Sequence, residues 1–110
     1  MTTATNTRHP LTISYTLMVS DEVIDNIKIN NGTRYWVADE EAEIGENDNG
    51  DITVTFGGET YTYDTETCLK GIALWIQNGG DWDDLKGCYT DPTDHDPIWQ
   101  YGFFGELIYG

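Results

Sequence analysis

The sequence predicts one α+β domain, an antiparallel sheet of four to five strands with two to three helices packed on one face. Two patterns support this fold class. Several short segments alternate apolar and polar residues, as half-buried strands do, and two others carry apolar residues at helical spacing. Strands that follow one another through tight turns pair antiparallel, which leaves the helices to cover one side of the sheet. A chain of 110 residues suits a single domain of this kind.

The N-terminal part predicts a polar lead-in, a strand and a helix. Residues 1–10 are polar and rich in threonine, so we expect a flexible segment before a single domain at 11–110. The alternation in residues 11–19, LTISYTLMV, predicts a strand. Ser20 then offers an N-cap, and the apolar spacing that follows predicts a short helix at Asp21–Ile29.

The middle of the chain predicts consecutive strands. Residues 33–43 have the pattern of a strand that becomes acidic toward its end, and the turn-forming sequence GENDNGD occupies 45–51. Residues 51–56 place Ile, Val and Phe on one face, which predicts a further strand. A Gly-Gly turn then leads into a return strand at 59–63, with glutamate and tyrosines on one face and threonines on the other.

The C-terminal part contains the clearest helical pattern. Residues 65–78 carry Leu, Ile, Ala and Ile at i, i+3, i+4 and i+7, and a Gly-Gly pair follows as a stop signal. We expect 81–96 to be an acidic loop. Asp96, which a proline follows, predicts the N-cap of a short helix at 98–104, and residues 106–109 predict a final edge strand.

Charge is the strongest functional signal in the composition. Twenty Asp and Glu face five Lys and Arg, for a net charge of −15. Such a field repels nucleic acid and anionic membranes and attracts basic surfaces, so we expect neither nucleic acid nor a membrane as a direct partner. A high-salt habitat is the alternative explanation of the acidity. The chain contains no apolar run of membrane-spanning length and no signal-peptide pattern, so we expect a cytoplasmic protein.

Two stretches concentrate the carboxylates. Alternate residues of a strand lie about 6.6 Å apart on one face, and duplex DNA carries one charge per roughly 1.7 Å of axis. Two acidic stretches can therefore imitate a row of phosphates, whereas the alternative is a merely solvated surface. An aromatic side chain among them would serve as an interface anchor. The expected partner-binding residues are Asp39, Glu40, Glu41, Glu43, Glu46, Asp48, Asp81, Trp82, Asp83, Asp84, Asp91, Asp94 and Asp96.

Catalytic, metal and cofactor signatures are weak. The GENDNGD segment lacks the carboxylates that an EF-hand loop needs at its first and last positions. His95 has aspartate neighbours but no nucleophile motif beside it, so we interpret it as an exposed loop residue. Cys68 and Cys88 follow no ligand pattern and are expected to be reduced thiols. We therefore predict no catalytic residue, no metal site and no cofactor.

The chain ends in WQYGFFGELIYG (Trp99–Gly110), which contains the pattern Q-Y-x-x-F-G-E-aliphatic-aliphatic-Y-G. This ending resembles that of a group of small acidic proteins of unknown function carried by phages and integrated mobile elements. The SDEVID segment (Ser20–Asp25) is similar to theirs as well. The resemblance implies a mobile-element accessory protein. Small acidic proteins of that origin often resemble anti-CRISPR or anti-restriction inhibitors, an association that does not itself determine function.

Charge and resemblance together lead to one hypothesis, that the protein inhibits a bacterial defence system in the cytoplasm of the host bacterium. The leading form of this hypothesis is an anti-CRISPR protein. It would occupy the basic DNA- or RNA-binding channel of a CRISPR effector or restriction enzyme as an acidic nucleic-acid mimic. Two alternatives stay open. A phage structural or regulatory module would bind its partner through exposed aromatic residues, and an enzyme would depend on His95 or on a bound metal.

Overall fold

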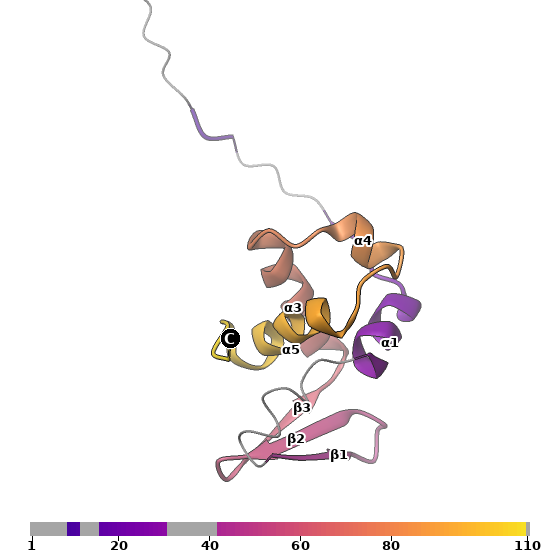
Figure 1. Ribbon diagram of the computed structural model, residues 1–110, viewed down its shortest axis with the longest axis vertical. Helices are drawn as coiled ribbons and strands as arrows, with labels where there is room; N and C mark the ends of the chain where they lie inside the picture. The colour runs from indigo at the N-terminus through magenta and orange to yellow at the C-terminus, as the bar shows by residue number, and fades with distance from the viewer. Residues whose placement is uncertain (1–8, 12–15, 31–41, 110) are drawn as a thin grey trace, which may run out of the picture.

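The protein has an α+β fold, with a three-stranded antiparallel sheet and four helices among the residues that its computed structural model describes, 9–11, 16–30 and 42–109. The sheet lies at one end of the domain and α4 at the other, and α3 and α5 cross between them (Figure 1). The α+β class is confirmed, but the described residues contain fewer strands and more helices than the sequence predicts. The elements are α1 (Asp21–Ile29), β1 (Glu43–Glu46), β2 (Ile52–Phe56), β3 (Glu59–Tyr63), α3 (Thr65–Gln77), α4 (Trp82–Lys86) and α5 (Pro92–Phe104).

The sheet has the order β1-β2-β3, and both of its strand pairs are antiparallel. Gly57 and Gly58 form the turn between β2 and β3, with φ of 60° and 80°. Residues with a Cβ rarely adopt positive φ, which explains why glycine occupies both positions. The large side chains of β2 and β3 face the helices, and Val54 and Tyr63 among them are fully buried. The opposite face carries threonines, so the alternation predicted for these two strands is confirmed.

Trp99 of α5 lies at the centre of the core. Its ring stacks on that of Tyr63 in β3, with ring centroids 3.7 Å apart and an angle of 7° between the planes. Its indole N–H donates a hydrogen bond of 3.0 Å to the carbonyl oxygen of Ile27 in α1. All three residues are fully buried. One side chain therefore joins α5 to the sheet and to α1, and such an aromatic pair contributes about 0.5–1.5 kcal/mol beyond its buried area.

Glycines allow α3 and α5 to cross in backbone contact. A Cβ at Gly71 of α3 would collide with the carbonyl oxygen of Ile98. A Cβ at Gly102 of α5 would lie 2.6 Å from the carbonyl oxygen of Thr67, which is closer than real Cβ atoms come. Glycine inside a helix costs about 0.5–1 kcal/mol relative to alanine, so these two positions give up helix propensity for a close crossing.

Polar side chains cap the beginnings of the four described helices. Ser20 caps α1 as predicted, Asp64 caps α3, Asp81 caps α4 and Asp91 caps α5. Each accepts a hydrogen bond from a backbone amide in the first helical turn, where amides have no partner within the helix. The two helices predicted before residue 80 are confirmed, within one residue at their ends.

The prediction of an acidic loop over 81–96 is wrong, because this stretch contains α4 and the first residues of α5. The aspartates that suggested a loop include the caps of both helices. The N-cap of α5 is Asp91, which Pro92 follows at the first helical position, and it is not Asp96. Pro97 consequently lies inside α5, where its missing amide leaves one helical hydrogen bond unmade.

Two predicted N-terminal strands differ from the structure or fall largely outside it. Of the predicted strand 11–19, residues 12–15 lie outside the described part, and residues 16–19 do not form a strand. Val19 is half-buried and packs against the core beside α3, so its apolar character reflects contact with a helix. Most of the predicted strand 33–43 also lies outside the described residues. β1 begins at the last residue of that segment and continues into the predicted turn.

The segment 106–109 does not form the predicted edge strand, because the side chain of Gln100 satisfies its backbone. The Oε1 atom of Gln100 accepts hydrogen bonds from the amides of Ile108 and Tyr109, at 2.9 and 2.8 Å. Its Nε2 atom donates to the carbonyl oxygen of Tyr109 at 3.0 Å. α5 ends just before, at Phe104, and its C-cap Gly105 has a φ of 75°, which suits glycine. These contacts explain the Gln and the first Gly of the C-terminal sequence pattern as structural residues.

Replacing Gly71 with alanine should destabilise the protein, although alanine is the better helix former. Helix propensity would raise the free energy of unfolding by about 0.5–1 kcal/mol. The added methyl group would, however, collide with the carbonyl of Ile98 and push α3 and α5 apart. We expect a net loss of about 1–3 kcal/mol, as in other overpacked cores, measured by urea denaturation. A more stable alanine variant would contradict the close crossing.

Asp64 should make the stability of the protein depend on pH at the acidic end. Hydrogen bonds from the amide and then the hydroxyl of Thr67 lower the pKa of Asp64. Because the folded pKa lies below the unfolded value, the ionised cap stabilises the fold above about pH 4, and that contribution is lost as pH falls through the lowered pKa. Asp64→Asn keeps a capping oxygen but does not titrate. Its unfolding free energy should therefore fall less steeply in acid than that of the wild type, and equal slopes would refute this role.

Candidate functional site

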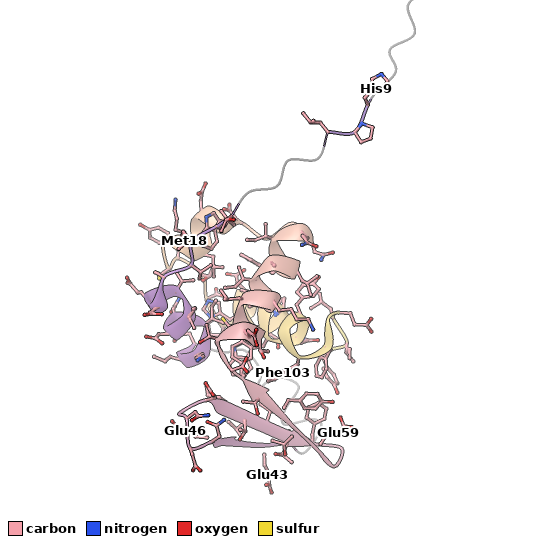
Figure 2. All side chains as sticks on the ribbon, turned by 180° about the vertical axis from the view of Figure 1, so that it is seen from behind. His9, Met18, Glu43, Glu46, Glu59 and Phe103 are labelled. Carbon is pink, nitrogen blue, oxygen red and sulfur yellow. The ribbon has the colours of Figure 1, made fainter. Side chains whose placement is uncertain are left out.

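The structure divides the described acidic residues of the predicted interface between two ends of the domain. We call the end of the domain that the sheet forms the sheet end, and the opposite end, where α4 lies, the helical end. Glu43 and Glu46 lie at the sheet end, away from Met18 at the helical end (Figure 2). The predicted residues from 81 onward lie on α4, on α5 and next to them, and α4 is at the end opposite the sheet (Figure 1). The described carboxylates of the prediction therefore lie at two separate ends of the domain and do not form one continuous row. Three further predicted residues lie outside the described part of the chain: Asp39, Glu40 and Glu41.

The carboxylates at the sheet end do not share a face. Glu43 pairs with Thr55 and Glu46 with Ile52, so their odd spacing along β1 directs them to opposite sides of the sheet. Asp48 is exposed in the turn between β1 and β2. These side chains are accessible, but their geometry offers no shared binding surface.

The carboxylates at the helical end are held in position by their capping bonds. Asp81 Oδ1 accepts from the amides of Asp83 and Asp84, at 2.9 and 3.3 Å. Asp91 and Asp94 cap each other in a capping box, in which Asp94 Oδ2 accepts from the amide of Asp91 at 3.2 Å. The D-x-x-D spacing of both stretches is the sequence signal that would have predicted these helix starts. Three predicted partner-binding residues thus also have a structural role.

The remaining predicted residues of this end differ in exposure. Asp83 and Asp84 are exposed on α4, and Asp83 forms an exposed ion pair with Lys86 at 3.8 Å. Exposed pairs of this kind contribute about 0–1 kcal/mol. Asp96 is half-buried and accepts a hydrogen bond from Gln100.

Ion pairing compensates little of the negative charge. Two ion pairs join described residues, Lys86 with Asp83 and Lys28 with Asp51 at 3.9 Å. The net charge of the chain is −15. The helical end therefore presents carboxylates to the solvent that few basic side chains offset, and it attracts cations by its field.

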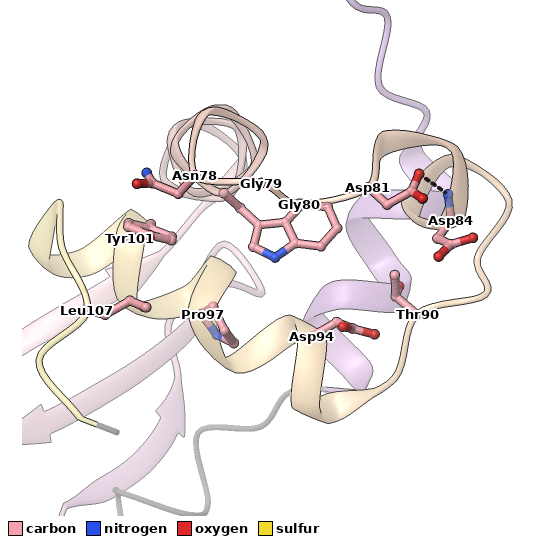
Figure 3. A pocket seen from close by; sticks show the side chains of 11 residues that line it. Asn78, Gly79, Gly80, Asp81, Asp84, Thr90, Asp94, Pro97, Tyr101 and Leu107 are labelled. Atoms are coloured by element: carbon pink, nitrogen blue, oxygen red, sulfur yellow. Dashed lines mark hydrogen bonds between the residues drawn. The ribbon is translucent and has the colours of Figure 1, made fainter.

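Three of these carboxylates line one pocket. Asp81, Asp84 and Asp94 lie along one side of a pocket of about 420 Å³, and Tyr101 and Leu107 lie along the other (Figure 3). The end of α3, the start of α4, α5 from Asp94 to Tyr101 and the segment after α5 form its walls. None of the described residues that line it is basic. The arrangement combines negative charge with an apolar wall, which suits an organic cation.

Sequence reasoning missed most of the other residues in this pocket. Trp75 lines it, and its indole packs directly on Gly80, where a Cβ would collide with the ring. The position of Trp75 off the apolar stripe of its helix was the available signal. Asn78 and Thr90 come from connecting segments, which carry no pattern of their own. Trp82, which the sequence predicts to be an interface anchor, is half-buried and packs against the core. Its position is that of a residue that completes the core.

His95 is fully buried in α5, so the prediction of an exposed loop histidine is wrong. Its Nδ1 atom bonds to the carbonyl oxygen of Asn30, and its Nε2 atom lies 2.7 Å from the hydroxyl of Thr90. A carbonyl oxygen only accepts, so Nδ1 carries the hydrogen. The side chain joins the end of α1 to the start of α5 and is a structural residue in this arrangement.

Both cysteines are free thiols, in agreement with the sequence prediction. Cys68 is buried in α3, and burial raises the pKa of its thiol. A raised pKa disfavours the thiolate, which is the reactive form of cysteine. The geometry of Cys68 is therefore that of a core residue.

Comparison with known protein families gives no match for this chain, and neither does comparison with curated protein sequences or with solved structures. Within the described residues, no helix combines the length and the apolar character needed to cross a membrane. The case for a function therefore rests on the charge and on the geometry of the helical end.

Substitutions at Asp91 should separate its capping role from its charge. Asp91→Ala removes the acceptor for the amides of Thr93 and Asp94, and we expect a loss of about 1 kcal/mol in unfolding free energy. Asp91→Ser removes the charge but keeps a capping oxygen, so its stability should stay close to that of the wild type. Thermal denaturation of both variants measures the difference. Equal losses in the two variants would show that the charge, and not the cap, stabilises α5.

Proposed function

We propose that this protein binds the basic, nucleic-acid-binding surface of another protein and blocks it as an acidic mimic of nucleic acid. The observation that carries the proposal is that few carboxylates pair with basic side chains of the same chain. The net charge is −15, and two ion pairs join described residues. Such a charge costs stability through self-repulsion. A basic partner would remove that cost and is attracted from a distance.

The helical end supplies the contact surface in this proposal. Asp83 and Asp84 are exposed there, and the caps Asp81, Asp91 and Asp94 have fixed positions. Lysine and arginine side chains that hold phosphates in a nucleic-acid channel would accept these carboxylates in their place. Fixed carboxylates lose little conformational entropy on binding, which favours the complex.

The C-terminal resemblance supports the more specific form of the proposal, an inhibitor of a bacterial defence system. The partner would then be a CRISPR effector, or else a restriction enzyme, and the setting would be the cytoplasm of the host bacterium. Gln100 and Gly105 of the shared pattern hold the fold together. These two residues therefore have structural roles in this chain, and the proposal assigns the inhibitory contact to the acidic residues.

A phage structural or regulatory module that binds through apolar contacts is the second candidate. A groove of about 380 Å³ between α3 and the segment before α1 favours it, lined by Leu17, Val19, Leu69, Ile72, Ala73, Ile76 and Gln77. Its apolar side chains are mainly aliphatic, whereas the sequence-based form of this alternative relied on aromatic residues. Substitutions in the groove, and not in the carboxylates, would then abolish partner binding.

Two matched charge variants test the leading proposal. The helical-end variant combines Asp83→Lys and Asp84→Lys with Asp81→Ser and Asp91→Ser, which keep capping oxygens. The sheet-end variant changes Glu43, Glu46 and Asp48 to Lys, with the same total change of charge. Tagged proteins are used to capture partners from a bacterial lysate at low and high salt.

We expect the wild type and the sheet-end variant to capture basic nucleic-acid-binding proteins at low salt, and the helical-end variant to lose them. Capture by the wild type should weaken at high salt, since the contacts are screened. If the helical-end variant captures the same proteins as the wild type, the assignment of the surface is wrong. If the wild type captures no basic protein at either salt concentration, the proposed function fails.

A further inference from the structure

The pocket at the helical end contains polar atoms that the fold leaves without partners. Tyr101 is only 8% exposed and lines the pocket, yet its hydroxyl forms no hydrogen bond with any described residue. The hydroxyl oxygen itself is not fully buried and keeps contact with the solvent. A ligand in this pocket can therefore bond to a hydroxyl group that no described residue occupies.

The carboxylates of the pocket retain acceptor atoms in the same way. The capping bonds use Oδ1 of Asp81 and Oδ2 of Asp94, and the second oxygen of each bonds to no described residue. Asp84 contributes only its backbone amide to the cap of α4, so both of its carboxylate oxygens stay available. Because the caps hold two of the three side chains in place, the acceptors are arranged before a ligand arrives.

The shape and the aromatic wall define the class of ligand. A pocket of about 420 Å³ is far larger than a bare metal ion needs, and it is of the size that holds an organic group. Trp75 adds an indole to the wall, and cations bind to indole faces. A planar guanidinium both stacks on an aromatic ring and donates to several carboxylate oxygens, whereas an ammonium is a compact point charge.

We propose that this pocket binds the guanidinium group of an arginine side chain. The inference rests on the proposed function and deepens it, because it names the group by which a basic partner would be held. The arginine enters with its stem along the apolar wall, and its N–H groups bond to Asp84 and to the unused oxygens of Asp81 and Asp94. The rest of the acidic surface then contributes long-range attraction.

Short blocked peptides that contain one arginine test the pocket directly. The same peptide with lysine, and with the uncharged arginine isostere citrulline, serves as comparison. The readout is an NMR titration of the full-length protein that follows the indole N–H signal of Trp75, assigned by its loss in Trp75→Phe. We expect the arginine peptide to shift this signal and to bind more tightly than the lysine and citrulline peptides.

Two single-charge substitutions form a matched pair for this titration. Asp84→Asn removes a charge that lines the pocket, and Glu66→Gln removes an exposed charge from the first turn of α3, outside the pocket. Neither change removes a capping oxygen, so both variants should fold. We expect Asp84→Asn to weaken arginine-peptide binding about tenfold and Glu66→Gln to change it by less than about twofold.

Equal weakening by both substitutions would overturn the pocket and leave attraction to diffuse charge. So would an unshifted Trp75 signal, or citrulline and lysine peptides that bind as tightly as the arginine peptide. The capture experiment fails independently of this titration. A pocket that binds arginine in a protein that captures no basic partner would retain the site and refute the nucleic-acid mimic.

Discussion

The contact between Trp99 and Tyr63 is the interaction on which the rest of the domain depends. It fixes α5 against β3, and the indole N–H of the same tryptophan fixes α1 through the carbonyl of Ile27. Trp99 can reach the core only if α3 and α5 cross closely. Gly71 of α3 permits that crossing, because a Cβ there would collide with the carbonyl oxygen of Ile98, next to Trp99. A small domain with so strong a negative charge needs a dense centre of this kind to offset self-repulsion.

Aspartate has two roles at the helical end. Asp81, Asp91 and Asp94 satisfy the amides at the starts of α4 and α5, and the same side chains supply charge to the surface. Amides in the first turns of the two helices donate hydrogen bonds to the carboxylates of Asp81 and Asp91. Charge and fold therefore support each other locally, although charge opposes folding over the whole molecule. The pocket arises where the two capped helix starts meet the end of α3.

Prediction from the sequence succeeded where one periodicity decided the structure. The strands at 51–56 and 59–63 and the helices of α1 and α3 follow from apolar spacing and from caps next to it. It failed over 81–96, where α5 has no clear apolar stripe and its aspartates were interpreted as loop residues, although they begin helices.

The candidate site was predicted only in part, for a related reason. Charge singled out Asp81, Asp84 and Asp94, but their meeting with Trp75 and Tyr101 depends on how three helices pack, which no local pattern encodes. The burial of His95 depends in the same way on a contact with Asn30, far away in the sequence.

The most direct test of the central claim is a competition measurement, in which this protein is added to a CRISPR effector that holds labelled DNA. We predict that the DNA is displaced at low salt and that displacement weakens as salt rises. DNA that stays bound at saturating protein, for CRISPR effectors and restriction enzymes alike, would contradict the account.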